Sequence, residues 1–64
     1  MFNHERMAEL IREKGIEQKA IAEAVGVSEQ AISYFVRGLK TPSIEILGRI
    51  AKYLGVSAAE LIKD

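Results

Sequence analysis

Four glycines divide this chain into short stretches of helical periodicity. Gly15, Gly26, Gly38 and Gly55 each follow a segment in which apolar residues recur three or four positions apart. Glycine adopts the left-handed conformation that ends many helices at no steric cost, so these positions predict helix ends. No segment alternates polar and apolar residues as a strand does, and no Asn-Gly or Asp-Gly hairpin turn occurs. The chain is therefore predicted to be all-α, with tight turns between short helices.

Capping residues predict where the helices begin. Asn3 and Ser28 are favourable N-caps, and Pro42 favours a first helical turn at about residues 42–43. Ser57 and Glu60 have the spacing of a capping box and give the clearest start in the chain. The predicted helices cover about 4–14, 18–25, from after 28 to 38, from about 42 to 55, and from after 57.

Helices this short must cross one another to enclose a core, which predicts a compact five-helix orthogonal bundle. The 64 residues have room for one core and are expected to form a single domain over residues 1–64. Ile44 is predicted to face the core with the rest of its helix. The predicted core residues of the later helices are Ile21, Val25, Val27, Ile32, Phe35, Ile44, Leu47, Ile50, Ala51 and Leu54.

Composition excludes several classes of protein. The chain has no cysteine, so neither a disulfide framework nor a cysteine zinc site is expected, and its one histidine, His4, cannot build a metal site alone. His4 is interpreted as a surface residue. No apolar run is long enough for a membrane span, and the N-terminus does not resemble a signal peptide, so a cytoplasmic location is expected. No nucleophile–base pair or phosphate loop is present, which argues against an enzyme, a cofactor or a small-molecule ligand.

Residues 18–38 have the pattern of a helix-turn-helix unit. Ala22 is small enough for two helix backbones to approach, and Gly26 permits a left-handed turn between them. Val27, Ile32 and Phe35 are predicted to point inward and to fix the angle of the second helix. That second helix can present its outer face to the major groove of DNA.

Nearly the whole chain, from about residue 6 to 62, resembles the Cro/repressor-type helix-turn-helix family, to which the lambdoid phage repressors belong. The resemblance implies a sequence-specific transcriptional regulator of repressor type that binds double-stranded, palindromic DNA as a homodimer. The matching residues are Gln18, Ile21-Ala22, Gly26-Val27-Ser28, Ile32-Ser33, Arg37-Gly38, Pro42-Ser43, Ile50-Ala51, Leu54-Gly55-Val56-Ser57 and Glu60-Leu61.

The resemblance also implies which residues contact DNA. Base contacts fall on the outward positions of the second helix of the unit, where Gln30 can pair with adenine and Glu29 can accept from cytosine. A structural role for Glu29 is equally consistent with the sequence, because a carboxylate in the first turn interacts favourably with the helix dipole. The implied base-reading residues are Glu29, Gln30, Ser33 and Tyr34, and the implied phosphate contacts are Gln18, Lys19, Ser28, Arg37, Lys40 and Thr41.

One alternative stays open. The chain carries nine Lys and Arg against nine Asp and Glu, whereas DNA-binding domains are usually basic. A neutral helix-turn-helix module suits a protein partner as well, in the manner of an antitoxin-like or antirepressor partner. Binding to a mixed-sequence duplex at low salt distinguishes the two.

Two further expectations concern apolar positions. Scattered exposed apolar residues are normal in proteins, but the family's dimer contacts imply a homodimer interface from Leu39, Ile46, Tyr53 and Ile62. Many family members also have an ion pair between the first and third helices, where this chain has Ile11 and Val36. This paired departure predicts that the two apolar side chains touch.

Overall fold

Four of the predicted helices form, and most of their ends lie at the predicted caps. The computed structural model describes residues 1–64 and contains α1 (His4–Lys14), α2 (Gln18–Val25), α3 (Glu29–Val36), α4 (Ile44–Leu54) and one turn of 3-10 helix, η1 (Ala58–Leu61). The side chains of Asn3, Ser28 and Ser43 accept hydrogen bonds from the backbone N–H groups three residues on, at 3.1, 3.0 and 3.2 Å. The four glycines predicted to end helices all have φ between 64° and 83°, so these predictions are confirmed.

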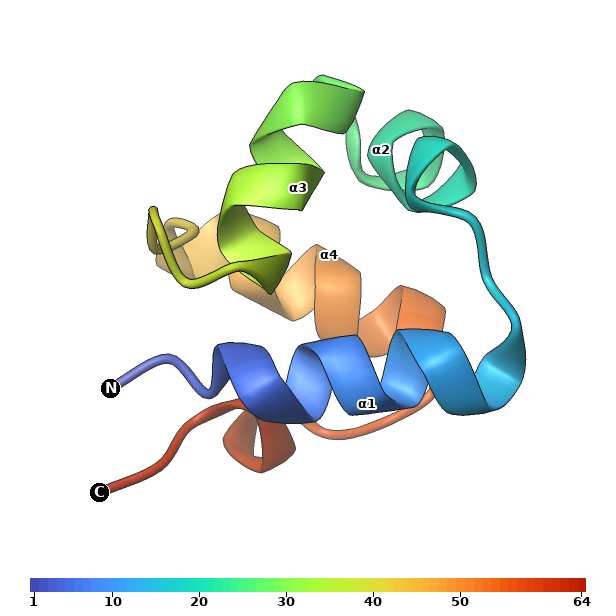
Figure 1. The fold of residues 1–64 in the computed structure, drawn as a ribbon. Helices are drawn as coiled ribbons and strands as arrows, with labels where there is room; N and C mark the ends of the chain where they lie inside the picture. The colour runs from blue at the N-terminus through green and yellow to red at the C-terminus, as the bar shows by residue number, and fades with distance from the viewer.

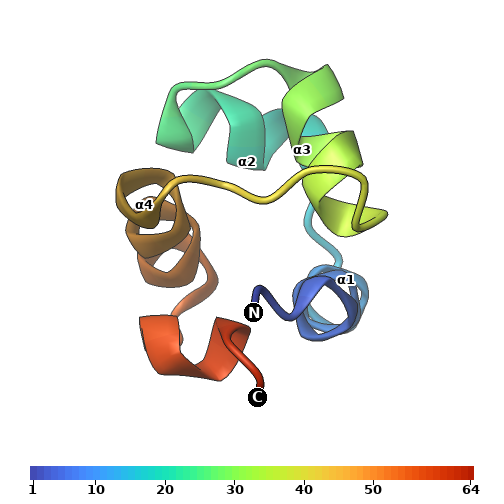
Figure 2. The same cartoon turned by 90° about the vertical axis from the view of Figure 1, so that its left-hand side faces the viewer.

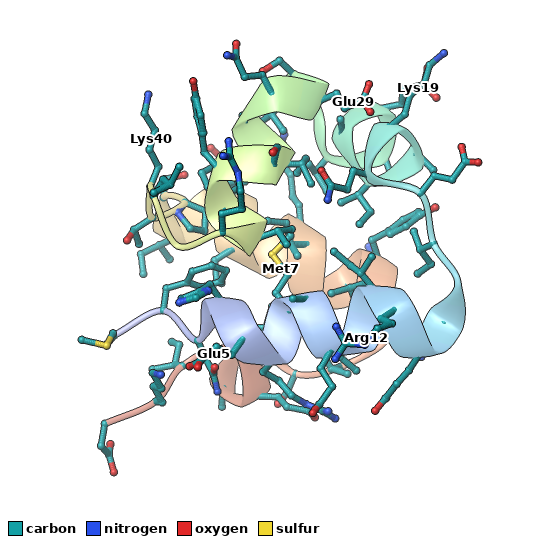
Figure 3. All side chains as sticks on the ribbon, viewed as in Figure 1. Glu5, Met7, Arg12, Lys19, Glu29 and Lys40 are labelled. Atoms are coloured by element: carbon teal, nitrogen blue, oxygen red, sulfur yellow. The ribbon has the colours of Figure 1, made fainter.

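The four α-helices enclose one core. In Figures 1 and 2, α1 and α4 run in the same general direction, and α2 and α3 lie across them. Every element contributes a side chain with no exposed surface, and Figure 3 shows that of Met7 pointing into the space between α1 and the other helices. The buried apolar residues are Met7, Leu10, Ile21, Ala22, Val25, Ile32, Phe35, Leu47, Ile50, Ala51, Leu54 and Leu61.

The fifth helix was predicted wrongly. The Ser57 side chain makes no capping bond, and η1 ends after four residues. One tertiary contact and one backbone conformation account for this: the Glu60 carboxylate accepts from Arg6 at 2.7 and 3.1 Å, and Ile62 is extended (φ −125°, ψ 137°). A carboxylate held by a distant guanidinium does not reach back to its own N-cap, and an extended residue cannot continue a helix.

The two ends of the chain pair with each other. Phe2 and Ile62 form an antiparallel bridge, with hydrogen bonds from Asn3 N to the Leu61 oxygen (2.7 Å) and from Lys63 N to the Met1 oxygen (2.8 Å). Lys63 also donates to Glu5 at 2.6 Å, and this hydrogen bond lowers the pKa of that exposed carboxyl. The N-terminal segment is therefore attached to the C-terminal segment rather than to α1 alone.

Two apolar residues of α4 occupy environments opposite to those predicted. Ile44 was expected in the core, but it is 82% exposed; Ile46 was expected to point outward, but it is half-buried against the core. Ile46 precedes Ile50 by one helical turn and shares its inward face, whereas the side chain of Ile44, the first residue of α4, points into solvent. Pro42, two residues earlier, is buried instead.

The longest helices have 11 residues. None combines the length and the apolarity that crossing a bilayer requires.

Candidate nucleic-acid interface

The turn between α2 and α3 is built as the sequence predicted. Gly26 has φ 83°, and the N–H groups of Gly26 and Val27 both bond to the Ala22 oxygen, at 2.9 and 3.1 Å. Ala22 is only 3% exposed and Val27 packs against the core. These contacts fix the angle of α3, because the buried side chains of Ile32 and Phe35 anchor its inner face.

The opposite face of α3 presents polar groups to solvent. Glu29 and Gln30 are exposed, and Ser33 and Tyr34 are half-buried. The Gln30 amide donates to the Tyr34 hydroxyl at 2.9 Å, one helical turn away. This bond restrains two side chains that the sequence assigned to base reading, before any ligand is present.

Two cationic side chains lie over the Tyr34 ring at the end of α3. The Arg37 guanidinium lies 5.4 Å from the ring centroid and the Lys40 ammonium 5.2 Å, both within the range of cation–π attraction. The backbone N–H groups of Leu39 and Lys40 donate to the backbone carbonyl oxygen of Tyr34, at 2.9 and 3.4 Å. We call Gln30, Tyr34, Arg37 and Lys40 the Tyr34 cluster.

Of the remaining predicted DNA contacts, Ser33 accepts a hydrogen bond from the Arg37 side chain through its backbone oxygen, at 3.4 Å. Ser28 already uses its hydroxyl to cap α3, and Gln18 begins α2 in a half-buried position. Lys19, Glu29 and Thr41 are exposed. Figure 3 shows Lys19, Glu29 and Lys40 projecting from the same upper side of the molecule.

The charges of this neutral chain are unevenly distributed. All four ion pairs are made by Arg6, Arg49 and Lys63, which bind Glu5, Glu9, Glu45 and Glu60. None of them uses Lys19, Arg37 or Lys40. Three cations thus stay available near α3, while four carboxylates elsewhere are neutralised within the protein.

The apolar residues predicted for a dimer interface differ in exposure. Leu39 and Ile62 are 62% and 46% exposed, and Ile44, predicted for the core, joins them as an exposed side chain. Tyr53 is exposed and lines a shallow depression with Ala24, Arg49 and Lys52, while Ile46 is half-buried against the core.

The sequence interpretation missed two tertiary contacts. Arg49, to which the sequence assigned no role, donates to the Val25 carbonyl oxygen at 3.1 Å and so binds the end of α2. His4, taken for a surface residue, lies with its Nδ1 3.2 Å from the Val36 oxygen at the end of α3. No local pattern signals either contact, since the partners are 24 and 32 residues away.

Comparison with known proteins identifies the family. A family model described as helix-turn-helix matches residues 7–61. This chain belongs to the helix-turn-helix family. The predicted resemblance to its Cro/repressor-type members is confirmed.

Two curated relatives of this helix-turn-helix chain show the extent of the similarity. The transcriptional repressor RstR of a cryptic CTXphi phage, from Vibrio cholerae, is 29% identical over 59 residues, which are 92% of this chain and 53% of the relative. An uncharacterised helix-turn-helix-type transcriptional regulator of Sinorhizobium fredii is 40% identical over 55 residues, 86% of this chain and 71% of that protein. The chain thus spans about half the length of the Vibrio repressor.

Solved structures share the fold closely. The phage P22 c2 repressor in complex with a synthetic operator superimposes with a TM-score of 0.90 at 33% identity, over 98% of this helix-turn-helix chain and 96% of the repressor. The biofilm regulator SinR of Bacillus subtilis, in complex with DNA, gives 0.82 at 33% identity, over 92% and 98%. SinR in complex with the SinI protein gives 0.85 at 32% identity, over 97% and 61%.

Proposed function

We propose that this helix-turn-helix domain is the DNA-reading part of a repressor-type transcriptional regulator, with α3 in the major groove of a double-stranded operator. The outer face of α3 carries the proposal: it ends in the Tyr34 cluster, where a restrained amide lies beside two unpaired cations. Similarity to the P22 repressor–operator and SinR–DNA complexes supports this orientation.

The proposed roles differ along α3. Gln30 reads a base edge, because a glutamine amide offers both a donor and an acceptor, as adenine does. Arg37 and Lys40 hold phosphates, together with Lys19 and Thr41. Tyr34 restrains its neighbours and adds a base or phosphate contact of its own.

The Gln30→Ala and Lys40→Ala substitutions test this division. Gln30→Ala is expected to cost about 1–3 kcal/mol at one operator position and to relax specificity there, while Lys40→Ala weakens operator and random duplex alike. An operator is first obtained by selecting bound duplexes from a random pool, and affinities are then measured on both duplexes across a salt series. Lys14→Ala, which removes an exposed lysine at the end of α1, is the matched control and should bind as the unsubstituted protein does. If Gln30→Ala weakens both duplexes equally, the assignment of Gln30 is wrong.

A protein-binding module is the second candidate. The exposed apolar side chains of Leu39, Ile44 and Ile62, and the similarity to SinR bound to SinI, favour it. A mixed-sequence duplex at low salt decides between the candidates, because phosphate contacts give measurable non-specific binding under those conditions. Absence of binding there would reject the DNA proposal.

We further propose that a second copy of this chain covers the exposed apolar residues. Figure 2 views the molecule from the side where the loop between α3 and α4, the start of α4 and both termini lie. Leu39, Ile44 and Ile62 belong to these segments, and Tyr53 or Ile46 would lie at the edge. A two-fold dimer would place its recognition helices about 34 Å apart, one turn of DNA.

Ile44→Lys is expected to abolish dimerisation without unfolding the monomer, because the side chain is 82% exposed. Sedimentation at tens of micromolar, with and without operator, measures the effect. Glu13→Gln changes the net charge by the same one unit on exposed surface of α1 and should leave assembly unchanged. A wild-type protein that is monomeric both free and on DNA would contradict the dimer.

A further inference from the structure

His4 connects the start of α1 to the end of α3. Its Nδ1 lies 3.2 Å from the Val36 oxygen, and since a carbonyl only accepts, Nδ1 carries the proton in this contact. Val36 is the last residue of α3, where helix carbonyls lack intrahelical partners. His4 therefore caps α3 from a different helix. In Figures 1 and 2 the start of α1 lies beneath the end of α3.

The imidazole ring also fits against Gly38. A Cβ atom at Gly38 would lie 2.7 Å from two atoms of the His4 ring and 2.9 Å from a third, closer than such atoms approach. Gly38 has φ 75°, a conformation that side chains disfavour. The absence of a side chain at Gly38 thus permits both the left-handed turn and the position of the ring.

One of the cations free of ion pairs lies between these two contact points, and another lies just after them. Arg37 is placed between Val36 and Gly38, and Lys40 follows two residues later. Both cations lie over the Tyr34 ring, and the backbone of Lys40 bonds to the Tyr34 oxygen. A shift of residues 36–38 would therefore move both cations relative to α3.

We propose that His4 is a positioning residue for DNA binding: from α1 it holds residues 36–38 in the conformation that presents Arg37 and Lys40 to phosphates. The inference rests on the proposed function. In this proposal, α1 influences the phosphate contacts at the end of α3 through two contacts of His4: the hydrogen bond to Val36 and the ring contact with Gly38.

Three variants test the proposal. His4→Ala removes both the hydrogen bond and the ring. His4→Asn retains an N–H donor close to the position of Nδ1. Gly38→Ala leaves His4 in place but forces its ring away, because the new Cβ would overlap it. Arg6→Gln is the matched control, since it breaks the contacts of α1 with Glu60 on η1 and none with α3.

Affinity for a mixed-sequence duplex is measured across a salt series, at a temperature below the unfolding range of every variant. The backbone amide NMR shifts of residues 36–40 are measured separately on the free protein. His4→Ala and Gly38→Ala are expected to weaken binding about two- to tenfold, the range of one hydrogen bond or phosphate contact. The slope of log K against log salt should fall by about 1, and the amide shifts of residues 36–40 should move. His4→Asn should recover most of the affinity, and Arg6→Gln should keep the wild-type slope even where it lowers stability.

The proposal is overturned if His4→Ala binds with wild-type affinity and slope, or if Arg6→Gln loses as much affinity as His4→Ala does. It is also overturned if His4→Ala leaves the amide shifts of residues 36–40 unchanged. A wild-type protein that binds no duplex rejects the proposed function, a result distinct from all of these, since the NMR measurement needs no DNA.

Discussion

Replacing Leu61 with alanine is expected to lower the free energy of unfolding by about 2–5 kcal/mol, the usual range for a buried leucine. The side chain of Leu61 has no exposed surface, and it contributes to the core from outside the four α-helices. A domain of 64 residues has little stability in reserve, because small domains bury a low fraction of their surface. The variant should therefore be substantially unfolded at 37 °C.

Urea denaturation followed by circular dichroism measures this effect. Ile62→Ala is the matched control: it removes a neighbouring side chain that is 46% exposed, and we expect it to cost less than about 1 kcal/mol. Equal losses for the two variants would mean that the last turn does not belong to the core.

Ile11→Arg is expected to destabilise the protein by about 1–3 kcal/mol, because it places an unpaired charge at a half-buried site. Ile11 and Val36 both pack against the core, from two helices that contact each other. Adding Val36→Glu restores the pair of residue types that many family members have. Part of the loss should then be recovered, with a coupling energy of about 0.5–2 kcal/mol.

A double-mutant cycle in urea, with the wild type, both single variants and the double variant, measures that coupling. Direct contact between the Ile11 and Val36 side chains stays a prediction until then. If the two single effects simply add, the two positions are independent and the argument from their paired departure fails.

Features set by neighbouring residues were predictable from the sequence. Asn3 and Ser28 cap the helices that follow them, and Gly15 and Gly55 end helices, because each acts on backbone within one turn. The buried face of α3 was predictable for the same reason, since Ile32 and Phe35 follow the period of the helix. The polar residues of α3, which make up most of the candidate site, occupy the helix positions that the buried apolar residues leave. They were therefore predictable as well.

What the sequence could not predict depends on where other elements end. Ile44 precedes Leu47 by three residues, yet its side chain at the first residue of α4 is exposed, while the flanking Pro42 and Leu47 are buried. Ser57 and Glu60 have the spacing of a capping box, yet Arg6 binds the Glu60 carboxylate instead. Arg37 and Lys40 lie over the Tyr34 ring next to a turn that His4 contacts, although His4 is 32 residues before Val36 in the sequence.

The pairing of Phe2 with Ile62 has a consequence for synthesis on the ribosome. α2 contacts both α3 and α4 within residues 18–54, whereas the bridge joins residues 60 positions apart. A nascent chain can thus assemble its central helices early, but the segment before α1 has no partner until residues 61–63 have emerged. Until that moment the start of α1, which carries His4, lacks its attachment to the C-terminal segment. We therefore expect the contact between His4 and the end of α3 to be fixed last.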